Sequence, residues 1–174
     1  YVYICHENDL KIAEVGAWGH SFVSRNASER DTAFAYAAAQ LELADKLGAA
    51  TCVNVSGSPG TQWDGIDPDN FSDETFQLVV TTVQRLIDTV QPQNTTFSLE
   101  PMPWMIPDSL ESYQALVEAI DRDAFAVHFD PANLIASHRY YMNQGKEMAR
   151  FIQTFSSKLC VVHMKDVLME DRYN

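Results

Sequence analysis

Short apolar runs alternate along the chain with longer amphipathic segments. The apolar runs are 10–18, 51–57, 95–101, 125–131 and 159–167. The segments with helical spacing are 28–49, 72–90, 109–121 and 139–155. Apolar residues follow one another within the runs, which is typical of parallel strands covered by helices. The pattern therefore predicts repeated strand–helix units within one α/β domain that spans 1–174.

Local signals predict where several of these elements begin and end. Ser28 is expected to cap the first long helix, and Gly48 is expected to end it. Either Ser72 or Asp73 should cap the second helix. The segment 139–155 is expected to be mostly helical. The segment 58–70 is the one long loop, and it has two interpretations, a lid over a substrate or a surface excursion.

Two parallel architectures are compatible with this order of elements, an open doubly wound sheet and a (β/α)8 barrel. An open sheet that binds nucleotides carries a glycine-rich turn after its first strand. The sequence SGSPG after Val55 does not match that pattern and leads into a long loop. A complete barrel needs about 250 residues, so five strands would be only part of one.

Three of the predicted strands end in a residue that is capable of chemistry: Glu100, Asp130 and His163. The spacings are 130 − 100 = 30 and 163 − 130 = 33 residues, each close to one strand–helix unit of about 30 residues. We therefore expect the three residues at one level of three consecutive parallel strands. In a barrel this level, at the carboxyl ends of the strands, is where active sites lie.

The alternation of side chains along each strand supports this convergence. If Glu100 points inward, Phe97 and Leu99 face the helices; if Asp130 points inward, so does His128. Two carboxylates and one imidazole suit a divalent ion, with Mn²⁺ or Mg²⁺ expected first and Co²⁺ or Zn²⁺ as alternatives. The competing interpretation is that each residue is simply solvated at a strand end.

The sequences SLEPMPW, HFDPAN and VVHMKD, in this order and spacing, resemble the xylose-isomerase-like TIM-barrel superfamily of sugar and sugar-phosphate isomerases and epimerases. The resemblance runs from about Lys11 to Val167. It implies an incomplete (β/α)8 TIM barrel in which about strands three to seven are present. It also implies that Glu100, Asp130 and His163 hold a divalent metal, together with a strand-eight glutamate that would lie beyond Asn174.

The chemistry implied by the resemblance is proton transfer at the carbon next to a sugar carbonyl, through an enediolate. Glu100 would be both a metal ligand and the catalytic acid/base. Two positions depart from the family pattern. Asn133 stands where many family epimerases carry a substrate-contacting histidine, and Met169 stands where some carry an arginine. Without the strand-eight glutamate, we expect no epimerase turnover by this chain.

Four residues are candidates for substrate binding. Asn133 keeps a polar contact at its position. Lys165 has inward parity and would contact a substrate oxygen or phosphate, or else form a strand-end salt bridge. Trp18 would stack on a sugar face, or else pack at the rim. Trp104 follows Glu100 and is expected in an apolar pocket wall.

Two other functions remain open. The endonuclease branch of the same superfamily is a zinc phosphodiesterase that needs further histidines and a basic DNA face. A non-catalytic sugar-binding barrel that has lost its metal is the other alternative. Metal analysis discriminates among them: one Mn²⁺ or Mg²⁺ supports the isomerase or epimerase, a zinc cluster the endonuclease, and no metal the binding barrel.

The composition limits the classes of molecule that the chain is expected to bind. The chain has 12 basic and 24 acidic residues, a net charge of −12, which disfavours nucleic acid and anionic membranes but not a small anionic substrate. Three scattered cysteines favour a reducing compartment, so we expect a cytoplasmic protein. The missing initiator methionine suggests a partial chain. Exposed barrel edges would make such a chain unstable or a homo-oligomer.

Overall fold

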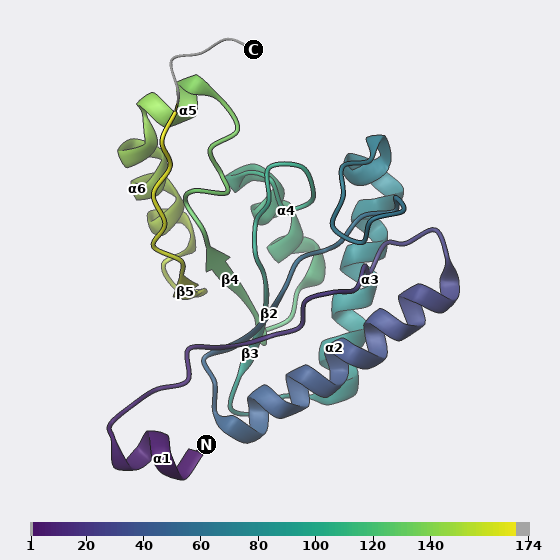
Figure 1. Ribbon diagram of the computed structural model, residues 1–174, viewed down its shortest axis with the longest axis vertical. Coiled ribbons are helices and arrows are strands. Elements are labelled where there is room, and N and C mark those ends of the chain that lie inside the picture. The colour runs from purple at the N-terminus through teal and green to yellow at the C-terminus, as the bar shows by residue number, and fades with distance from the viewer. Residues whose placement is uncertain (1, 170–174) are drawn as a thin grey trace.

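Five parallel strands form one curled sheet, a half-barrel, in the computed structural model, which describes residues 2–169 (Figure 1). The strands are β1 (Glu14–Gly16), β2 (Thr51–Asn54), β3 (Thr96–Leu99), β4 (Phe125–Phe129) and β5 (Leu159–Val162). They pair in the order β1-β2-β3-β4-β5. Because a doubly wound sheet reverses its strand order and this sheet does not, the structure decides for part of a (β/α)8 barrel.

A short helix precedes β1, and the helices after it connect each strand to the next and cover one face of the sheet. They are α1 (Val2–Glu7), α2 (Ala27–Leu47), α3 (Asp73–Val90), α4 (Leu110–Ile120), α5 (His138–Met142) and α6 (Gln144–Phe155), with a 3-10 turn η1 (Pro68–Phe71). Helix α1 lies apart from the sheet and buries no residue (Figure 1). Within the described residues, no helix is both long and apolar enough to cross a membrane.

The core lies between the sheet and its helices, and it confirms the predicted alternation of side chains. Phe97 and Leu99 of β3 and Val127 and Phe129 of β4 are fully buried in this core. Ser98 points to the opposite face, where its Oγ lies 2.9 Å from Thr51 Oγ1. The concave face of the sheet therefore carries polar side chains such as Thr51 and Ser98, beside the apolar Val53 and Ala126.

Two of the predicted helix ends are confirmed and one is wrong. Gly48 ends α2 in the left-handed conformation, with φ of 64°, and Ser72 caps α3 by accepting a hydrogen bond from the Thr75 amide. Helix α2, however, begins at Ala27 and is capped by Asn26, which accepts a hydrogen bond from the Ser28 amide at 3.0 Å. A side-chain amide oxygen accepts a hydrogen bond from the free backbone amides of the first turn as well as a hydroxyl does, so both Asn26 and Ser28 are suitable caps.

The predicted helix over 139–155 is interrupted at Asn143. The φ and ψ of Asn143 are −118° and 13°, outside the helical range, and its amide bonds to the Tyr140 carbonyl at 3.0 Å. Two helices, α5 and α6, therefore replace one. Gly145 lies in the first turn of α6, where its low helix propensity costs less than in a helix interior.

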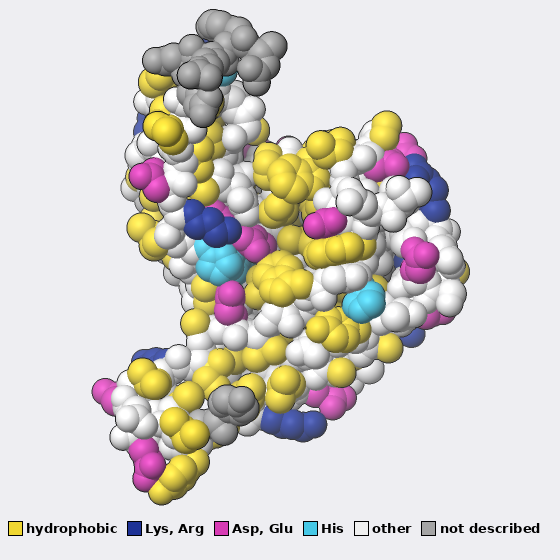
Figure 2. Space-filling model, in the orientation of Figure 1, with side chains coloured by type: hydrophobic (Ala, Val, Ile, Leu, Met, Phe, Trp, Pro, Cys, Tyr) yellow, Lys and Arg dark blue, Asp and Glu magenta, His cyan; other side chains and the backbone are white. Residues whose placement is uncertain are grey.

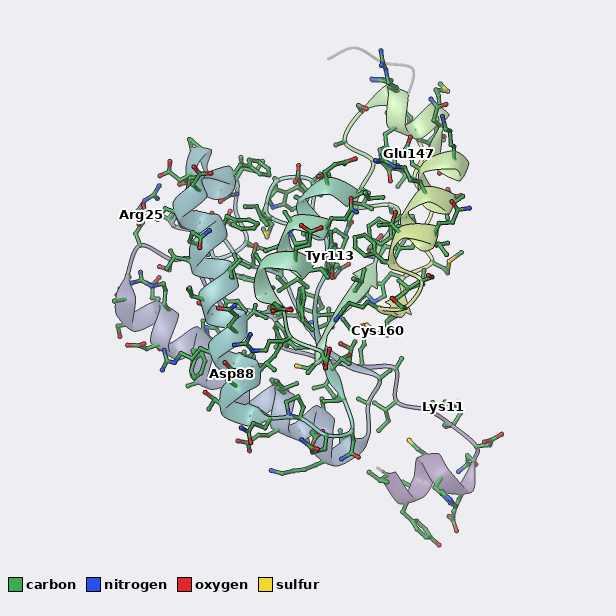
Figure 3. The ribbon with its side chains drawn as sticks, turned by 180° about the vertical axis from the view of Figure 1, so that it is seen from behind. Lys11, Arg25, Asp88, Tyr113, Glu147 and Cys160 are labelled. Carbon is green, nitrogen blue, oxygen red and sulfur yellow. The ribbon has the colours of Figure 1, made fainter. Side chains whose placement is uncertain are left out.

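One tyrosine of α4 fastens two strands to each other beneath the concave face. Tyr113 is fully buried between α4 and the sheet (Figure 3). Its hydroxyl donates to the Leu99 carbonyl at 2.6 Å and accepts from the His128 amide at 3.0 Å. Leu99 immediately precedes Glu100, and His128 lies two residues before Asp130. The hydroxyl thus fixes the ends of β3 and β4 relative to each other.

We predict that Tyr113→Phe destabilises the fold by about 1–3 kcal/mol, because it leaves a buried amide and a buried carbonyl without this partner. Urea unfolding followed by circular dichroism measures the loss. Tyr36→Phe is the matched control, since Tyr36 is 37% exposed, and its cost should stay within about 0.5 kcal/mol. Equal stability of the two variants would contradict this role of Tyr113.

Candidate metal centre

The three residues predicted at strand ends meet on the concave face, at the carboxyl ends of β3, β4 and β5. One ligand atom from each of Glu100, Asp130 and His163 lies within 4.8 Å of the others. His163 Nδ1 is 3.2 Å from Glu100 Oε1 and 3.7 Å from Asp130 Oδ2. Backbone hydrogen bonds continue each ladder to this point, from the Glu100 amide to Asn54 and from the His163 amide to Phe129.

The three residues converge as predicted, although Glu100 is offset from Asp130 in the register of the ladder. The ladder pairs Leu99 with Val127, so Glu100 lies opposite His128 and not opposite Asp130. Strands of a barrel are tilted to its axis, so partners in the ladder differ in height. Glu100 and Asp130 meet because this tilt compensates for the difference in register.

The pKa values of the two buried carboxyl groups shift in opposite directions. Glu100 is 7% exposed and Asp130 is fully buried. Burial raises the pKa of Glu100, and its hydrogen bonding with Asp130 adds to the effect, against the opposing influence of Lys165. For Asp130, burial acts to raise the pKa, but hydrogen bonds with Glu100 and Lys165 outweigh it and lower the pKa. Such a pair suits acid/base chemistry, with one group protonated more readily than the other.

Lys165 supplies the positive charge at this place in the structure. Its Nζ contacts Asp130 Oδ2 and lies 3.2 Å from Glu100 Oε1. Burial acts to lower the pKa of Lys165, but hydrogen bonds to the two carboxylates outweigh it and raise the pKa. Lys165 has the predicted inward direction, and it forms the salt bridge that was one of its two interpretations.

The three side chains fit a divalent cation. The Oδ1 atom of Asp130 accepts hydrogen bonds from the amides of Ala132 and Asn133, at 3.1 and 3.3 Å. These bonds fix the carboxylate so that Oδ2 faces Glu100 Oε1 and His163 Nδ1. Two carboxylate oxygens and one imidazole nitrogen then point to one place, which is the donor set expected for Mn²⁺, Mg²⁺, Co²⁺ or Zn²⁺.

A cavity of about 360 Å³ adjoins this cluster, a size within the range of small-molecule sites. It is lined by Trp18, Val55, Trp63, Asp64, Glu100, Met102, Met105, Asn133 and Lys165. Three predicted substrate-binding residues, Trp18, Asn133 and Lys165, are therefore on its wall. Asn133 Nδ2 also donates to Glu100 Oε1 at 3.1 Å. Figure 2 shows basic, histidine and acidic side chains touching one another beside hydrophobic side chains on this face.

Trp104 is not on this wall and has a different contact. Its indole N–H donates to the Asp64 carbonyl at 2.9 Å, and its own carbonyl accepts from Asn70 Nδ2 at 2.6 Å. These bonds attach the 58–70 loop to the segment that follows Glu100. The loop is therefore a cavity wall, through Trp63 and Asp64, and not a free surface excursion.

Sequence reasoning missed Glu14, which joins the cluster from β1. Its Oε1 is 3.0 Å from His163 Nε2, and its Oε2 is 3.5 Å from His128 Nε2. His128 is fully buried on the concave face, as predicted, and burial lowers its pKa to about 4. For His163, burial acts to lower the pKa, but Glu14 and Glu100 outweigh it and raise the pKa. The sequence signal that could have identified Glu14 is the alternation of side chains, which places Glu14 on the same side of its strand as Trp18.

The family model described as xylose isomerase-like TIM barrel matches residues 1–173. No curated protein gives a significant match to the sequence. Solved structures share the fold at low identity. The 3-keto-D-glucoside 4-epimerase from E. coli has a TM-score of 0.69 at 13% identity, over 95% of this chain and 62% of that chain. The D-allulose 3-epimerase from Methylomonas sp. has a TM-score of 0.71 at 18% identity, over 93% and 55%.

A third neighbour is not a sugar epimerase by name. The probable 3-DHS dehydratase from Bacillus anthracis has a TM-score of 0.72 at 15% identity, over 95% of this chain and 54% of that chain. The chain thus spans between about half and two thirds of the length of these neighbours. At such identities the likeness concerns the fold.

Lys165 occupies the position where a cation would meet Glu100 and Asp130, so we predict that Lys165→Met tightens Mn²⁺ binding. Removing one positive charge should lower the dissociation constant roughly tenfold, about 1.4 kcal/mol. Calorimetric titration measures the constant. Lys146→Met, on the exposed surface of α6, makes the same charge change elsewhere and should have little effect. Weaker binding by Lys165→Met would show that the ammonium does not compete with the ion.

Proposed function

Because the chain belongs to the xylose isomerase-like TIM-barrel family, we propose that it carries the metal- and substrate-binding part of a metal-dependent sugar or sugar-phosphate isomerase or epimerase. The observation that carries the proposal is the convergence of Glu100, Asp130 and His163 beside a cavity. The presence of sugar epimerases among the structural neighbours also supports this proposal.

Glu100, Asp130 and His163 would hold one divalent ion, with Mn²⁺ or Mg²⁺ favoured by two carboxylate ligands. Such an ion, when bound, polarises a sugar carbonyl and stabilises the negative charge that develops on its oxygen. Asp130 is suited to permanent ligation, because its pKa is lowered and its Oδ1 is held by two backbone amides.

Glu100 is the proposed acid/base. It borders the cavity, and its raised pKa brings it closer to the range in which a carboxyl group both accepts and returns a proton. In the proposed reaction the Glu100 carboxylate takes the proton from the carbon next to the sugar carbonyl, and the electron pair of that C–H bond moves into the enediolate. In an isomerisation the protonated Glu100 returns its proton to the neighbouring carbon while a hydroxyl proton moves between the two oxygens. In an epimerisation a second acid on the opposite face returns a proton to the same carbon, and Glu100 keeps the one it took.

Other cavity residues orient and select the substrate in this proposal. Asn133 holds Glu100 by a hydrogen bond of 3.1 Å and offers a polar contact to a hydroxyl group. Lys165 also lines the cavity, and once an ion takes its place between Glu100 and Asp130, its ammonium would contact a substrate oxygen or phosphate. Trp18 and Trp63 present aromatic surfaces to the cavity, suited to the apolar face of a sugar ring.

The two alternative functions fit the site less well. A zinc-cluster phosphodiesterase needs several histidines, and the candidate ligand groups within residues 2–169 contain only His128 and His163. A net charge of −12 also disfavours a DNA substrate. A non-catalytic sugar-binding barrel would leave the buried pair of Glu100 and Asp130 without a function, although burying carboxylates is costly.

We expect the chain to bind one equivalent of Mn²⁺ and Asp130→Asn to weaken this binding by about a hundredfold, because a buried charged ligand is lost. Titration followed by electron paramagnetic resonance gives the stoichiometry and the affinity. Asp123→Asn, in the exposed turn before β4, should bind like the original chain. Binding of several Zn²⁺ equivalents would favour the endonuclease, and no metal binding would favour the non-catalytic barrel.

The second test concerns the chemistry. In D₂O, with Mn²⁺ and a panel of ketohexoses and their phosphates, we expect deuterium to enter the carbon next to the carbonyl of at least one sugar. Exchange requires only one base, so it tests Glu100 independently of any second carboxylate. Proton NMR follows the exchange, which Glu100→Gln should abolish. A sugar that binds without exchange would contradict a catalytic role.

A further inference from the structure

Glu14 faces two histidines, one of which follows the strand at the opposite edge of the sheet. Strands β1 and β5 stand at the two ends of the strand order, yet the curl of the sheet brings Glu14 Oε1 within 3.0 Å of His163 Nε2. The other carboxylate oxygen, Oε2, lies 3.5 Å from His128 Nε2. One carboxylate thus faces one nitrogen of each imidazole.

The charges around His163 distinguish its two ring nitrogens. On the Nδ1 side, the acceptors Glu100 and Asp130 already share the ammonium of Lys165. On the Nε2 side, the ion pairs of Glu14 within the described part of the chain are with His128 and His163 alone. Glu14 is therefore the less compensated acceptor, and its distance to His163 is the shorter one, 3.0 Å against 3.2 Å.

We propose that Glu14 is a positioning residue, which accepts the Nε2–H proton of His163 and so leaves the Nδ1 lone pair facing Glu100 and Asp130. This inference rests on the proposed function, because the metal of that function would take the Nδ1 lone pair. Carboxylates that fix the tautomer and ring orientation of a ligating histidine commonly change metal affinity by about 10–100-fold.

His128 completes this arrangement. Its ring is fully buried and meets the ring of His163 edge-on, with centroids 4.2 Å apart and an interplanar angle of 86°. His128 thus packs against the His163 ring and restrains its orientation, while in this proposal Glu14 sets its tautomer. The same three residues, Glu14, His128 and His163, also have ligand atoms within 4.8 Å of one another, so a second cation site is an outcome that the test must separate.

The first measurement reads the tautomer and requires no metal. Nitrogen-15 NMR of histidine-labelled, metal-free protein, at a pH where the imidazole is neutral, should show His163 protonated at Nε2. Glu14→Met should abolish this preference, whereas Glu14→Gln, which keeps an acceptor oxygen without the charge, should retain part of it. Glu111→Gln is the matched control on the exposed surface of α4, and it should leave the signal unchanged. Circular dichroism verifies that each variant is folded.

The second measurement reads metal affinity. Glu14→Met should weaken Mn²⁺ binding by about 10–100-fold at an unchanged stoichiometry of one, and Glu14→Gln should weaken it less. A wild-type His163 protonated at Nδ1, or a preference unaltered in Glu14→Met, overturns the inference and leaves the proposed function standing. Two Mn²⁺ equivalents that fall to one in Glu14→Met also overturn it, in favour of a second cation site. Failure of any metal to bind contradicts the proposed function, while the NMR result decides the role of Glu14 separately.

Discussion

Two carboxylates buried side by side at the ends of β3 and β4 are the constraint on which the rest of the site depends. Removing a carboxylate from water is costly unless it gains hydrogen bonds or a positive charge. Glu100 and Asp130 obtain both: backbone amides bind Asp130, Asn133 binds Glu100, and Lys165 contacts both carboxylates. A cation, from the protein or from solution, therefore stabilises this packing.

The fold holds the two carboxylates together from behind. The helices pack against one face of the sheet, which leaves Glu100, Asp130 and His163 on the concave face. Tyr113 links the backbone of β3 to that of β4 within two residues of each carboxylate. In front, the bonds of Asn70 and Trp104 attach the 58–70 loop to the segment after Glu100. The cavity beside the carboxylates is thus built from segments that are bonded to one another.

The sequence was sufficient for the sheet and for the three strand-end residues, because both depend on regular spacing. Phe97, Leu99, Val127 and Phe129 mark the buried face by simple alternation, and the spacing of about one strand–helix unit aligns Glu100 with its partners. The family resemblance of these motifs agrees with the family model, which matches residues 1–173.

The remaining features depend on three-dimensional relations that spacing does not encode. Glu14 meets His163 only because the sheet curls, and a pattern within one strand does not reveal curvature. Trp104 was expected on the cavity wall, but its N–H donates to the Asp64 carbonyl, in a loop that is distant in sequence. Asn26 and Ser28 are both suitable caps, so the sequence alone does not decide at which of them α2 starts. The break at Asn143 likewise has no strong signal in the sequence.

The central claim is that Glu100, Asp130 and His163 hold one divalent ion on the concave face. A crystal structure of the chain with Mn²⁺, with anomalous scattering measured at the manganese edge, tests it most directly. We expect a single anomalous peak in contact with Glu100, Asp130 Oδ2 and His163 Nδ1. A peak among Glu14, His128 and His163 instead, or no peak on the concave face at saturating Mn²⁺, would contradict it.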